Sequence, residues 1–257
     1  MALKIRSLAS GSKGNCILVS ADNTNILIDA GISFARISSS LSALGLTVSD
    51  IDGVLITHEH NDHILGLKKL ADYVPLYCHE RTFEAIPFKK EIERNLALAD
   101  LDNGFCIKNV YIMPFRVPHD AQYPLGFCFY RNGIKAAYAT DLGHVPDYIV
   151  NNLSDCHLLF IESNHDEDLL KFGSYPEALK RRILSKNGHL SNKTAGEVLK
   201  RLAGGRLRSV MLGHLSLENN RPEKARACAE DALKGMGINI EVAGQYSISE
   251  EIFYKHG

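Results

Sequence analysis

Four side chains that can ligate a metal ion lie within the segment THEHNDH, residues 57–63. They directly follow the apolar run GVLI, which is typical of a strand buried on both faces. His58 and His60 are two residues apart, so both point to the same side of an extended strand end. Asp62 and His63 follow, where the chain is expected to turn into a helix. The four side chains can therefore splay around two neighbouring ions.

The chemistry of these side chains indicates an open, catalytic metal site. Imidazole and carboxylate groups together suit Zn²⁺, Mn²⁺ or Fe²⁺, whereas a structural zinc is usually closed by thiolates. The six cysteines of the chain are scattered and form no CxxC pair. Further ligands are expected where other apolar strands end, namely His119 in VPHDA, Asp141 in ATDLG and His214 in LGHLS. Asp120 is the alternative to Asp141.

Hydrolysis is the reaction class that such a site predicts. Two neighbouring ions can hold a hydroxide whose pKa is lowered toward neutrality, polarise the electrophile and stabilise the developing negative charge. The same nucleophile serves thioesters, lactones, β-lactams and phosphodiesters, so the metal site alone does not select the substrate.

A basic segment, residues 180–208, gives the strongest indication of the substrate. It holds nine Lys and Arg residues and one acid, in a chain whose net charge is −1. These charges can simply be the solvated faces of two helices. The sequence GHLSN within the segment, however, precedes a helix whose free N–H groups favour a phosphate. The residues predicted to bind substrate here are Arg181, Arg182, His189, Ser191 and Asn192.

A Gly-rich loop, SGSKGN at residues 10–15, lies near the N-terminus. Loops of this kind are usually tight turns. Ser10, Ser12 and Asn15 are nevertheless predicted to present hydrogen-bonding groups to the substrate at the rim of the site.

Alternating strands and helices must position all of these residues. The expected strands are LKIRSLAS, CILVSA, NILIDAG, GVLITH, VPLYCH, VYIMPFRV, GFCFYRNG, IKAAYATD, HLLFIES, SVMLGH, INIEVA and EIFYK. Apolar residues at helical spacing predict one helix over Ala195–Leu202, with Ser191 or Asn192 as its cap. A second helix is predicted after Pro222, with Asn220 as its cap and its apolar stripe reaching Met236. Further helices are expected over 34–44, 63–72, 145–154 and 175–185.

Composition limits the class of protein. The near balance of 29 Lys+Arg and 30 Asp+Glu excludes a generally basic nucleic-acid coat protein. No apolar run exceeds four residues, so no membrane span is expected, and the N-terminal residues do not resemble a signal peptide. Without linkers or repeats, a single domain over residues 1–257 is expected. We expect a cytoplasmic protein with reduced cysteines.

The ordered motifs resemble those of the metallo-β-lactamase superfamily. The resemblance implies an α/β fold, a four-layer αββα sandwich with a dinuclear site along one edge of its two sheets. It implies that His58, His60 and His119 hold the first metal ion. The second would be held by Asp62, His63 and His214, with Asp141 bridging the two. Asp29 in LIDAG would hydrogen-bond a ligand without itself binding metal.

Several further motifs are similar to those of the WalJ/YycJ-type branch of bacterial nucleases. They are LASGSKGN, TDLGH, ESNHD, YPEALKRRI, GHLSN and LGHLSLENN. This resemblance implies a phosphodiesterase that acts on nucleic acid, with DNA favoured, as a 5′-to-3′ exonuclease. The implied cofactors are two divalent ions, zinc or manganese, with iron as a further candidate, and the nucleophile is a hydroxide that bridges them.

The predicted roles and the alternatives complete the hypothesis. Asp62 would orient the hydroxide or move its proton, and His189 would steady a phosphate or protonate the leaving oxygen. His165 in SNHD can approach the site from a strand end or cap a loop, and the loop is the favoured interpretation. The alternative function is a small-molecule hydrolase for a thioester, lactone or cyclic phosphodiester that uses the same metals. A non-hydrolytic diiron protein is disfavoured, because such relatives have an acidic residue where His60 stands.

Overall fold

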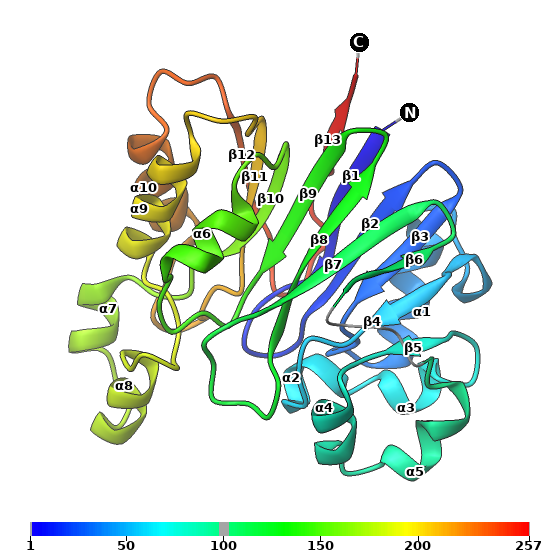
Figure 1. Cartoon of the computed structure of the whole chain (residues 1–257). Helices are drawn as coiled ribbons and strands as arrows, with labels where there is room; N and C mark the ends of the chain where they lie inside the picture. The colour runs from blue at the N-terminus through cyan, green and yellow to red at the C-terminus, as the bar shows by residue number, and fades with distance from the viewer. Residues whose placement is uncertain (1, 98–102, 257) are drawn as a thin grey trace.

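Two β-sheets pack face to face, and helices cover their outer sides (Figure 1). The structure is a computed structural model that describes residues 2–97 and 103–256. Within these residues the first sheet has the strand order β13-β1-β2-β3-β4-β5. The second has the order β12-β11-β10-β9-β8-β7-β6.

The elements have the following bounds. The first sheet contains β1 (Ala2–Ala9), β2 (Cys16–Ala21), β3 (Thr24–Ile28), β4 (Gly53–Leu55), β5 (Leu76–Tyr77) and β13 (Ile252–Lys255). The second contains β6 (Phe105–Ile107), β7 (Val110–Arg116), β8 (Leu125–Arg131), β9 (Ile134–Ala139), β10 (Leu158–Glu162), β11 (Ser209–Gly213) and β12 (Asn239–Val242). The α-helices are α1 (Phe34–Ala43), α2 (Asn61–Ile64), α3 (Leu67–Leu70), α4 (Glu80–Ala85), α5 (Lys89–Ile92), α6 (Asp147–Leu153), α7 (Glu167–Phe172), α8 (Glu177–Ile183), α9 (Asn192–Leu202) and α10 (Pro222–Ala232).

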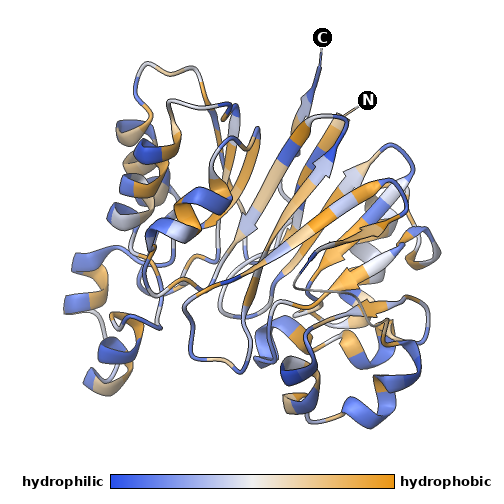
Figure 2. Ribbon diagram, viewed as in Figure 1, coloured by the Kyte–Doolittle hydropathy of each residue, from blue (hydrophilic) through white to orange (hydrophobic). Residues whose placement is uncertain are grey.

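Three apolar clusters separate four layers. One cluster, which includes Ile17 and Phe127, is built from both sheets and therefore lies between them. A second joins the first sheet to helices such as α1 through Leu41. A third joins Leu159 of the second sheet to Leu199 of α9. Apolar side chains accordingly run along the strands and the helix faces that meet them (Figure 2). The predicted α/β sandwich is confirmed.

Strand β10 shows why an apolar run is needed here. Its side chains alternate between the two faces of the sheet. Leu158 and Phe160 join the cluster between the sheets, whereas Leu159 and Ile161 join the cluster under the helices. Both faces are buried, so the strand is apolar from Leu158 to Ile161, and only Glu162 at its end is charged.

Phe160 provides a test of this packing. Its side chain is fully buried, and its ring centroid lies 5.1 Å from that of Tyr138. Phe160→Ala is expected to lower the free energy of unfolding by about 3–5 kcal/mol, because it removes apolar contacts and leaves a cavity. Phe172→Ala is the control, because the Phe172 side chain is 77% exposed. It should change the free energy of unfolding by less than about 0.5 kcal/mol. Equal urea unfolding curves for the two variants would contradict the packing described here.

Helix α9 begins as predicted. Ser191 is its N-cap and accepts a hydrogen bond from the Thr194 N–H at 3.2 Å. The buried face includes Ala195, Val198 and Leu202, which are the residues that predicted the helix.

Two of the predicted helices differ from those in the structure. Helix α10 ends at Ala232, so Met236 is exposed beyond it, because Gly235 takes a left-handed φ of 78° that a helix cannot continue through. Its N-cap is Arg221, not Asn220. The predicted helix over 63–72 is divided into α2 and α3, because the N–H of Gly66 donates to a carbonyl outside the helix, that of Ala30.

All twelve predicted strands are present. The elements that were not predicted are β6, α4, α5, α7 and two 3₁₀ helices, Val48–Asp50 and Glu93–Asn95, and they span three to six residues each. Elements this short contain too few residues to establish a period in the sequence. No helix within residues 2–97 and 103–256 combines the length and apolar character needed to cross a bilayer.

Strand direction brings the polar motifs together. Strands β9, β10 and β11 are mutually parallel, so their carboxyl ends meet at one edge of the second sheet. Asp141, Glu162 and His214 stand at or just beyond those ends. The parallel strands β3 and β4 of the first sheet end at Ile28 and Leu55, just before Asp29 and the predicted ligand segment. The site is thus built from strand ends of both sheets.

Candidate metal centre

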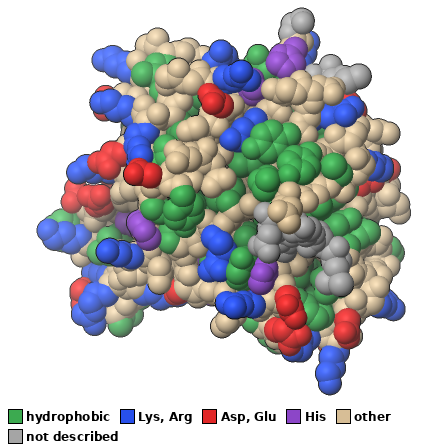
Figure 3. Space-filling view, in the orientation of Figure 1, with side chains coloured by type: hydrophobic (Ala, Val, Ile, Leu, Met, Phe, Trp, Pro, Cys, Tyr) green, Lys and Arg blue, Asp and Glu red, His purple; other side chains and the backbone are tan. Residues whose placement is uncertain are grey.

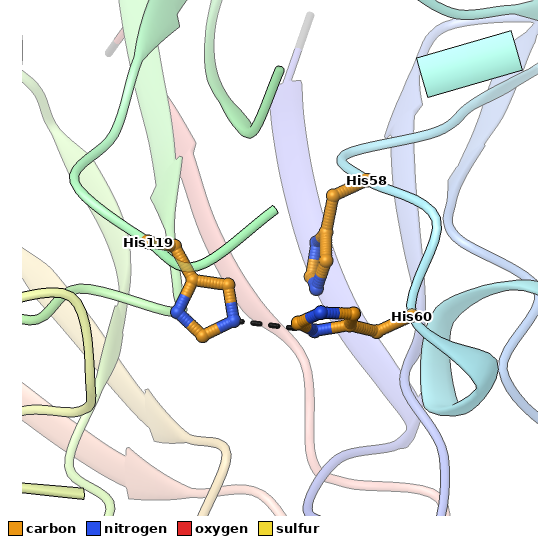
Figure 4. A group of neighbouring side chains, drawn as sticks. All are labelled: His58, His60 and His119. Carbon is orange, nitrogen blue, oxygen red and sulfur yellow. Dashed lines mark hydrogen bonds between the residues drawn. The ribbon is translucent and has the colours of Figure 1, made fainter. Parts of the chain in front are cut away.

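Three histidines from two separate loops form one ligand group. His58 and His60 follow β4, and His119 follows β7 (Figure 4). Each offers a ring nitrogen, and these atoms lie within 4.8 Å of one another. His119 Nε2 and His60 Nδ1, for example, lie 3.3 Å apart. This is the set predicted for the first metal ion.

A second ligand group lies beside the first. Its members are Asp62, His63 and His214, again with ligand atoms within 4.8 Å of one another. Asp62 Oδ2 is 3.5 Å from Nε2 of both His63 and His214. Asp141 contacts both groups, because its Oδ1 is 3.5 Å from His119 Nε2 and its Oδ2 is 3.5 Å from His63 Nε2. The structure therefore places Asp141 between the groups, and metal ligation by these seven residues stays a prediction.

Buried polar atoms without a hydrogen-bond partner indicate that the site suits metal ions. Among the described residues, His58 Nε2, His214 Nε2 and Asp141 Oδ2 are buried without a hydrogen-bond partner. Leaving such atoms unpaired in a protein interior is costly. All three belong to the ligand groups, so bound divalent ions would supply the missing partners.

Asp29 and Thr57 orient two of the predicted ligands, His63 and His58. Asp29 Oδ2 lies 2.7 Å from His63 Nδ1, and the Thr57 hydroxyl donates to the same carboxylate. The Thr57 oxygen lies 2.9 Å from His58 Nδ1. A carboxylate only accepts hydrogen bonds, so the network assigns the proton of His63 to Nδ1 and leaves its Nε2 toward the cluster. Asp29 thus has the geometry predicted for it, and Thr57 is an addition.

Glu162 is a site residue that sequence reasoning missed. Its Oε1 accepts from Nδ1 of both His189 and His214 at 2.7 Å, and its Oε2 accepts the N–H groups of Leu142 and Leu190 at 3.0 Å. Glu162 also belongs to a group of residues that could hold a metal ion. Both of its carboxylate oxygens, however, already accept two hydrogen bonds each, so its role is to orient His189 and His214. The signal was present: HLLFIE ends an otherwise apolar strand with an acid.

Charge balance accounts for the protonation of the buried groups. Burial raises the pKa of Glu162, but His189 and His214 outweigh it and lower that pKa to about 2. Burial lowers the pKa of His214, but Asp141, Asp62 and Glu162 outweigh it and raise that pKa to about 10. In these contacts the histidines and carboxylates stabilise one another's charged forms. Metal ions would replace protons in this balance, so metal binding should release protons.

Three site residues have backbone in the left-handed region. The φ angles are 61° at Asp29, 58° at Asp141 and 55° at His214. Residues other than glycine rarely adopt this conformation, and such strain is concentrated at functional sites. At His214 the conformation is held by its own N–H, which donates to Ser10 Oγ at 2.7 Å.

The two ligand groups face a cleft of about 260 Å³. Of the predicted substrate-binding residues, Ser12, Arg182 and His189 line it. Arg182 makes two contacts with Asp120, at 2.6 and 3.1 Å. Asp120 therefore pairs with an arginine and lies outside the ligand groups found in the described chain. Arg181 is exposed.

The other predicted substrate-binding residues are buried and bonded within the protein. Ser10 and Asn15 hydrogen-bond each other, and Asn15 Nδ2 lies 3.3 Å from His63 Nε2. Ser191 donates to Glu167, and Asn192 bonds to Asn220. Their positions give them a supporting role, so the predicted helix N-terminus is occupied by the protein's own side chains.

His165 is a buried residue. Both of its ring nitrogens are without a hydrogen-bond partner in the part of the chain that is described, and burial lowers its pKa to about 4. The expectation that it caps a loop is wrong, because Asp166 is the residue that caps α7. The carbonyl of His165 accepts from the Asn192 N–H at 2.8 Å, which fixes α9 beside β10.

Comparison with known proteins identifies the family. The model of the β-lactamase superfamily domain matches residues 24–214, which include all of the predicted ligands. The chain belongs to the metallo-β-lactamase superfamily. This membership agrees with its sandwich fold and ligand cluster, and it makes the protein a metal-dependent hydrolase.

Relatives within this superfamily cover nearly the whole chain. It is 34% identical to exodeoxyribonuclease YycJ of Bacillus anthracis over 250 residues, 93% of this chain and 92% of the relative. It is also 34% identical to exodeoxyribonuclease WalJ of Streptococcus pneumoniae over 252 residues, 94% of each chain. The metallo-β-lactamase fold protein YhfI from Bacillus subtilis superposes with a TM-score of 0.74 at 15% identity, covering 99% of this chain and 100% of that one. That structure supports the fold alone.

Proposed function

We propose that this metallo-β-lactamase superfamily chain is a phosphodiesterase that acts on DNA as a 5′-to-3′ exonuclease. The observation that carries the proposal is the placement of two ligand groups in one cleft with His189 and Arg182. Similarity to exodeoxyribonucleases over more than nine-tenths of the chain supports the choice of DNA.

We propose two divalent ions as cofactors, zinc or manganese, with iron as a further candidate. His58, His60 and His119 would hold one ion. Asp62, His63 and His214 would hold the other, and Asp141 would bridge them. When bound, two such ions lower the pKa of water to give a nucleophile and neutralise charge on a phosphate.

The chain's own residues perform the proton transfers. Asp62 is surrounded by histidines that keep its carboxylate ionised, because His63 and His214 outweigh the effect of burial on its pKa. As an ionised carboxylate it can accept a hydrogen bond from a water held beside it, and we propose that it orients that water or moves its proton. The Nδ1–H of His189 donates a hydrogen bond to Glu162, so its Nε2 is the atom available to the cleft. The doubly protonated ring carries a second N–H at Nε2, which can hold a phosphate oxygen or protonate the leaving oxygen.

Arg182 is the expected phosphate contact, and Arg181 is its matched control. Both arginines are exposed on α8, but of the two only Arg182 lines the cleft. Arg182→Ala should weaken DNA binding. It should also lower the magnitude of the slope of the logarithm of the association constant against the logarithm of salt concentration by about 1, because one phosphate contact is lost. The loss also removes the arginine partner of Asp120, whose other described contact is with His119 Nε2 at 3.3 Å. Arg181→Ala should leave the slope nearly unchanged in the same fluorescence-anisotropy titrations. Equal effects of the two variants would contradict this assignment.

The basic segment as a whole does not form a uniform surface. On the face shown in Figure 3, acidic and basic side chains are interspersed over the side occupied by α7 to α10. Arg201, for example, pairs with Asp147. Binding is therefore expected to depend on the few cations at the cleft.

The class of substrate can be tested directly. Purified protein loaded with Mn²⁺ or Zn²⁺ is expected to hydrolyse bis(p-nitrophenyl) phosphate and leave an acyl thioester intact. Turnover of the thioester alone would instead support the small-molecule hydrolase.

A further inference from the structure

One helix supplies an apolar wall to an otherwise polar cleft. Leu179 and Ile183 of α8 lie one turn apart and both line the cleft, and Tyr175 lines it just before the helix begins. The remaining wall consists of polar and ligand side chains. It includes Ser12, His60, Asp62, Asp141, Asn164, His189, His214 and Ser216. The cleft therefore combines the apolar surface of these three residues with the predicted metal ligands.

Tyr175 is available to a ligand. Its side chain is half-buried. In residues 2–97 and 103–256 no aromatic ring stacks on it and its hydroxyl makes no hydrogen bond. Arg182 of α8 also lines the cleft, where it pairs with Asp120. A cleft that contains an aromatic ring, an arginine and the predicted metal ligands matches the chemistry of a nucleotide, which has a flat base and a charged phosphate.

The backbone fixes this wall relative to the ligand cluster. The His189 N–H donates to the Ile183 carbonyl at 2.9 Å, directly after the turn that ends α8. His119 Nδ1 lies 3.3 Å from the Gly188 carbonyl. At Gly188 a side chain is excluded, because a Cβ atom would lie 2.1 Å from the Ile183 carbonyl oxygen. The end of α8 is thus bonded to the predicted acid, and the loop that follows the helix is bonded to a predicted ligand, so a base on this wall would have a defined position relative to both.

We propose that Tyr175, with Leu179 beside it, forms the surface on which the nucleobase of the scissile nucleotide stacks. The inference rests on the proposed nuclease function and adds a substrate-binding residue to it. Stacking of a base on an aromatic ring tolerates all four bases, since each has a π-face. The site should therefore require a base without selecting its identity.

Two oligodeoxynucleotides test the proposal. They are single-stranded and identical except that the 5′-terminal nucleotide carries a base in one and is abasic in the other. The Mn²⁺-loaded protein should show a kcat/KM about 5- to 100-fold higher on the substrate with the base, which is the range expected for one stacked base. Tyr175→Ala and Tyr175→Leu should lower that ratio to about 1 by slowing only the substrate with the base. Tyr175→Phe should keep it.

A control variant and a binding measurement separate the outcomes. Tyr148 on α6 is 46% exposed, so Tyr148→Ala is a matched control that should keep the wild-type ratio. In an Asp62→Asn background, which should bind DNA without cutting it, Tyr175→Ala should raise Kd only for the oligonucleotide with the base. An unchanged ratio in Tyr175→Ala, or an equal loss on both substrates, would overturn the inference alone. A wild-type protein that cuts neither oligonucleotide would overturn the proposed function, and the inference with it.

Discussion

Asp62→Asn is expected to lower kcat on a phosphodiester by about 10²–10⁴-fold, the range that positioned acid–base groups contribute. Asparagine has nearly the same size and can keep hydrogen bonds near His63 and His214. It cannot accept a proton, and it removes a negative charge from a predicted metal site. Both losses act on the reacting atoms. The measurement is steady-state hydrolysis of bis(p-nitrophenyl) phosphate at a fixed metal concentration.

Asp147→Asn is the control for this variant. Asp147 has a side chain that is 89% exposed and pairs only with surface Arg201 in the described structure, so its loss should leave kcat within about twofold. Metal content per chain should be determined for both variants. An Asp62→Asn protein that retains more than half of the activity with a full complement of metal would show that Asp62 neither binds the ions nor moves the proton.

Removal of metal is expected to lower the Tm by about 10 °C. Ions at about 1,000 times their Kd stabilise the folded state by about 4 kcal/mol, and each kcal/mol shifts the Tm of a chain this long by about 2–4 °C. The physical cause is the set of buried, unpaired atoms in the cluster, such as His58 Nε2 and His214 Nε2. Thermal unfolding followed by circular dichroism, with chelator and then with added Zn²⁺ or Mn²⁺, measures the change.

A double variant gives the control for metal removal. His58→Ala with His60→Ala removes two predicted ligands, so its Tm should respond much less to chelator. If metal analysis showed that the wild-type protein had lost its ions while its Tm was unchanged, the cluster would not be a site where ions stabilise the fold.

The features that were predicted best depend on residues that lie close together in the sequence. The four ligands of the segment 57–63 were visible because one strand end and one short helix carry them together. The cap of α9 at Ser191 was visible for the same reason. Strands such as β10 were visible because both of their faces are buried.

Features that depend on contacts between distant segments were predicted poorly. Glu162 and Thr57 were missed because their roles arise only when strand ends from different parts of the chain meet. Ser191 and Asn192 were taken for phosphate contacts, since the sequence does not show that Glu167 and Asn220 occupy them. The break after α2 likewise follows from a hydrogen bond to a distant carbonyl.

A time course with 5′-labelled single- and double-stranded DNA tests the proposed nuclease most directly. The protein would be loaded with Mn²⁺ or Zn²⁺, with Asp62→Asn as the inactive control. We predict that labelled mononucleotide appears from the earliest times and that the control releases none, because removal begins at the 5′ end and requires the metal centre. A ladder of gradually shortened labelled strands would contradict the polarity. Intact DNA with every metal, together with turnover of a thioester or lactone, would contradict the nuclease function itself.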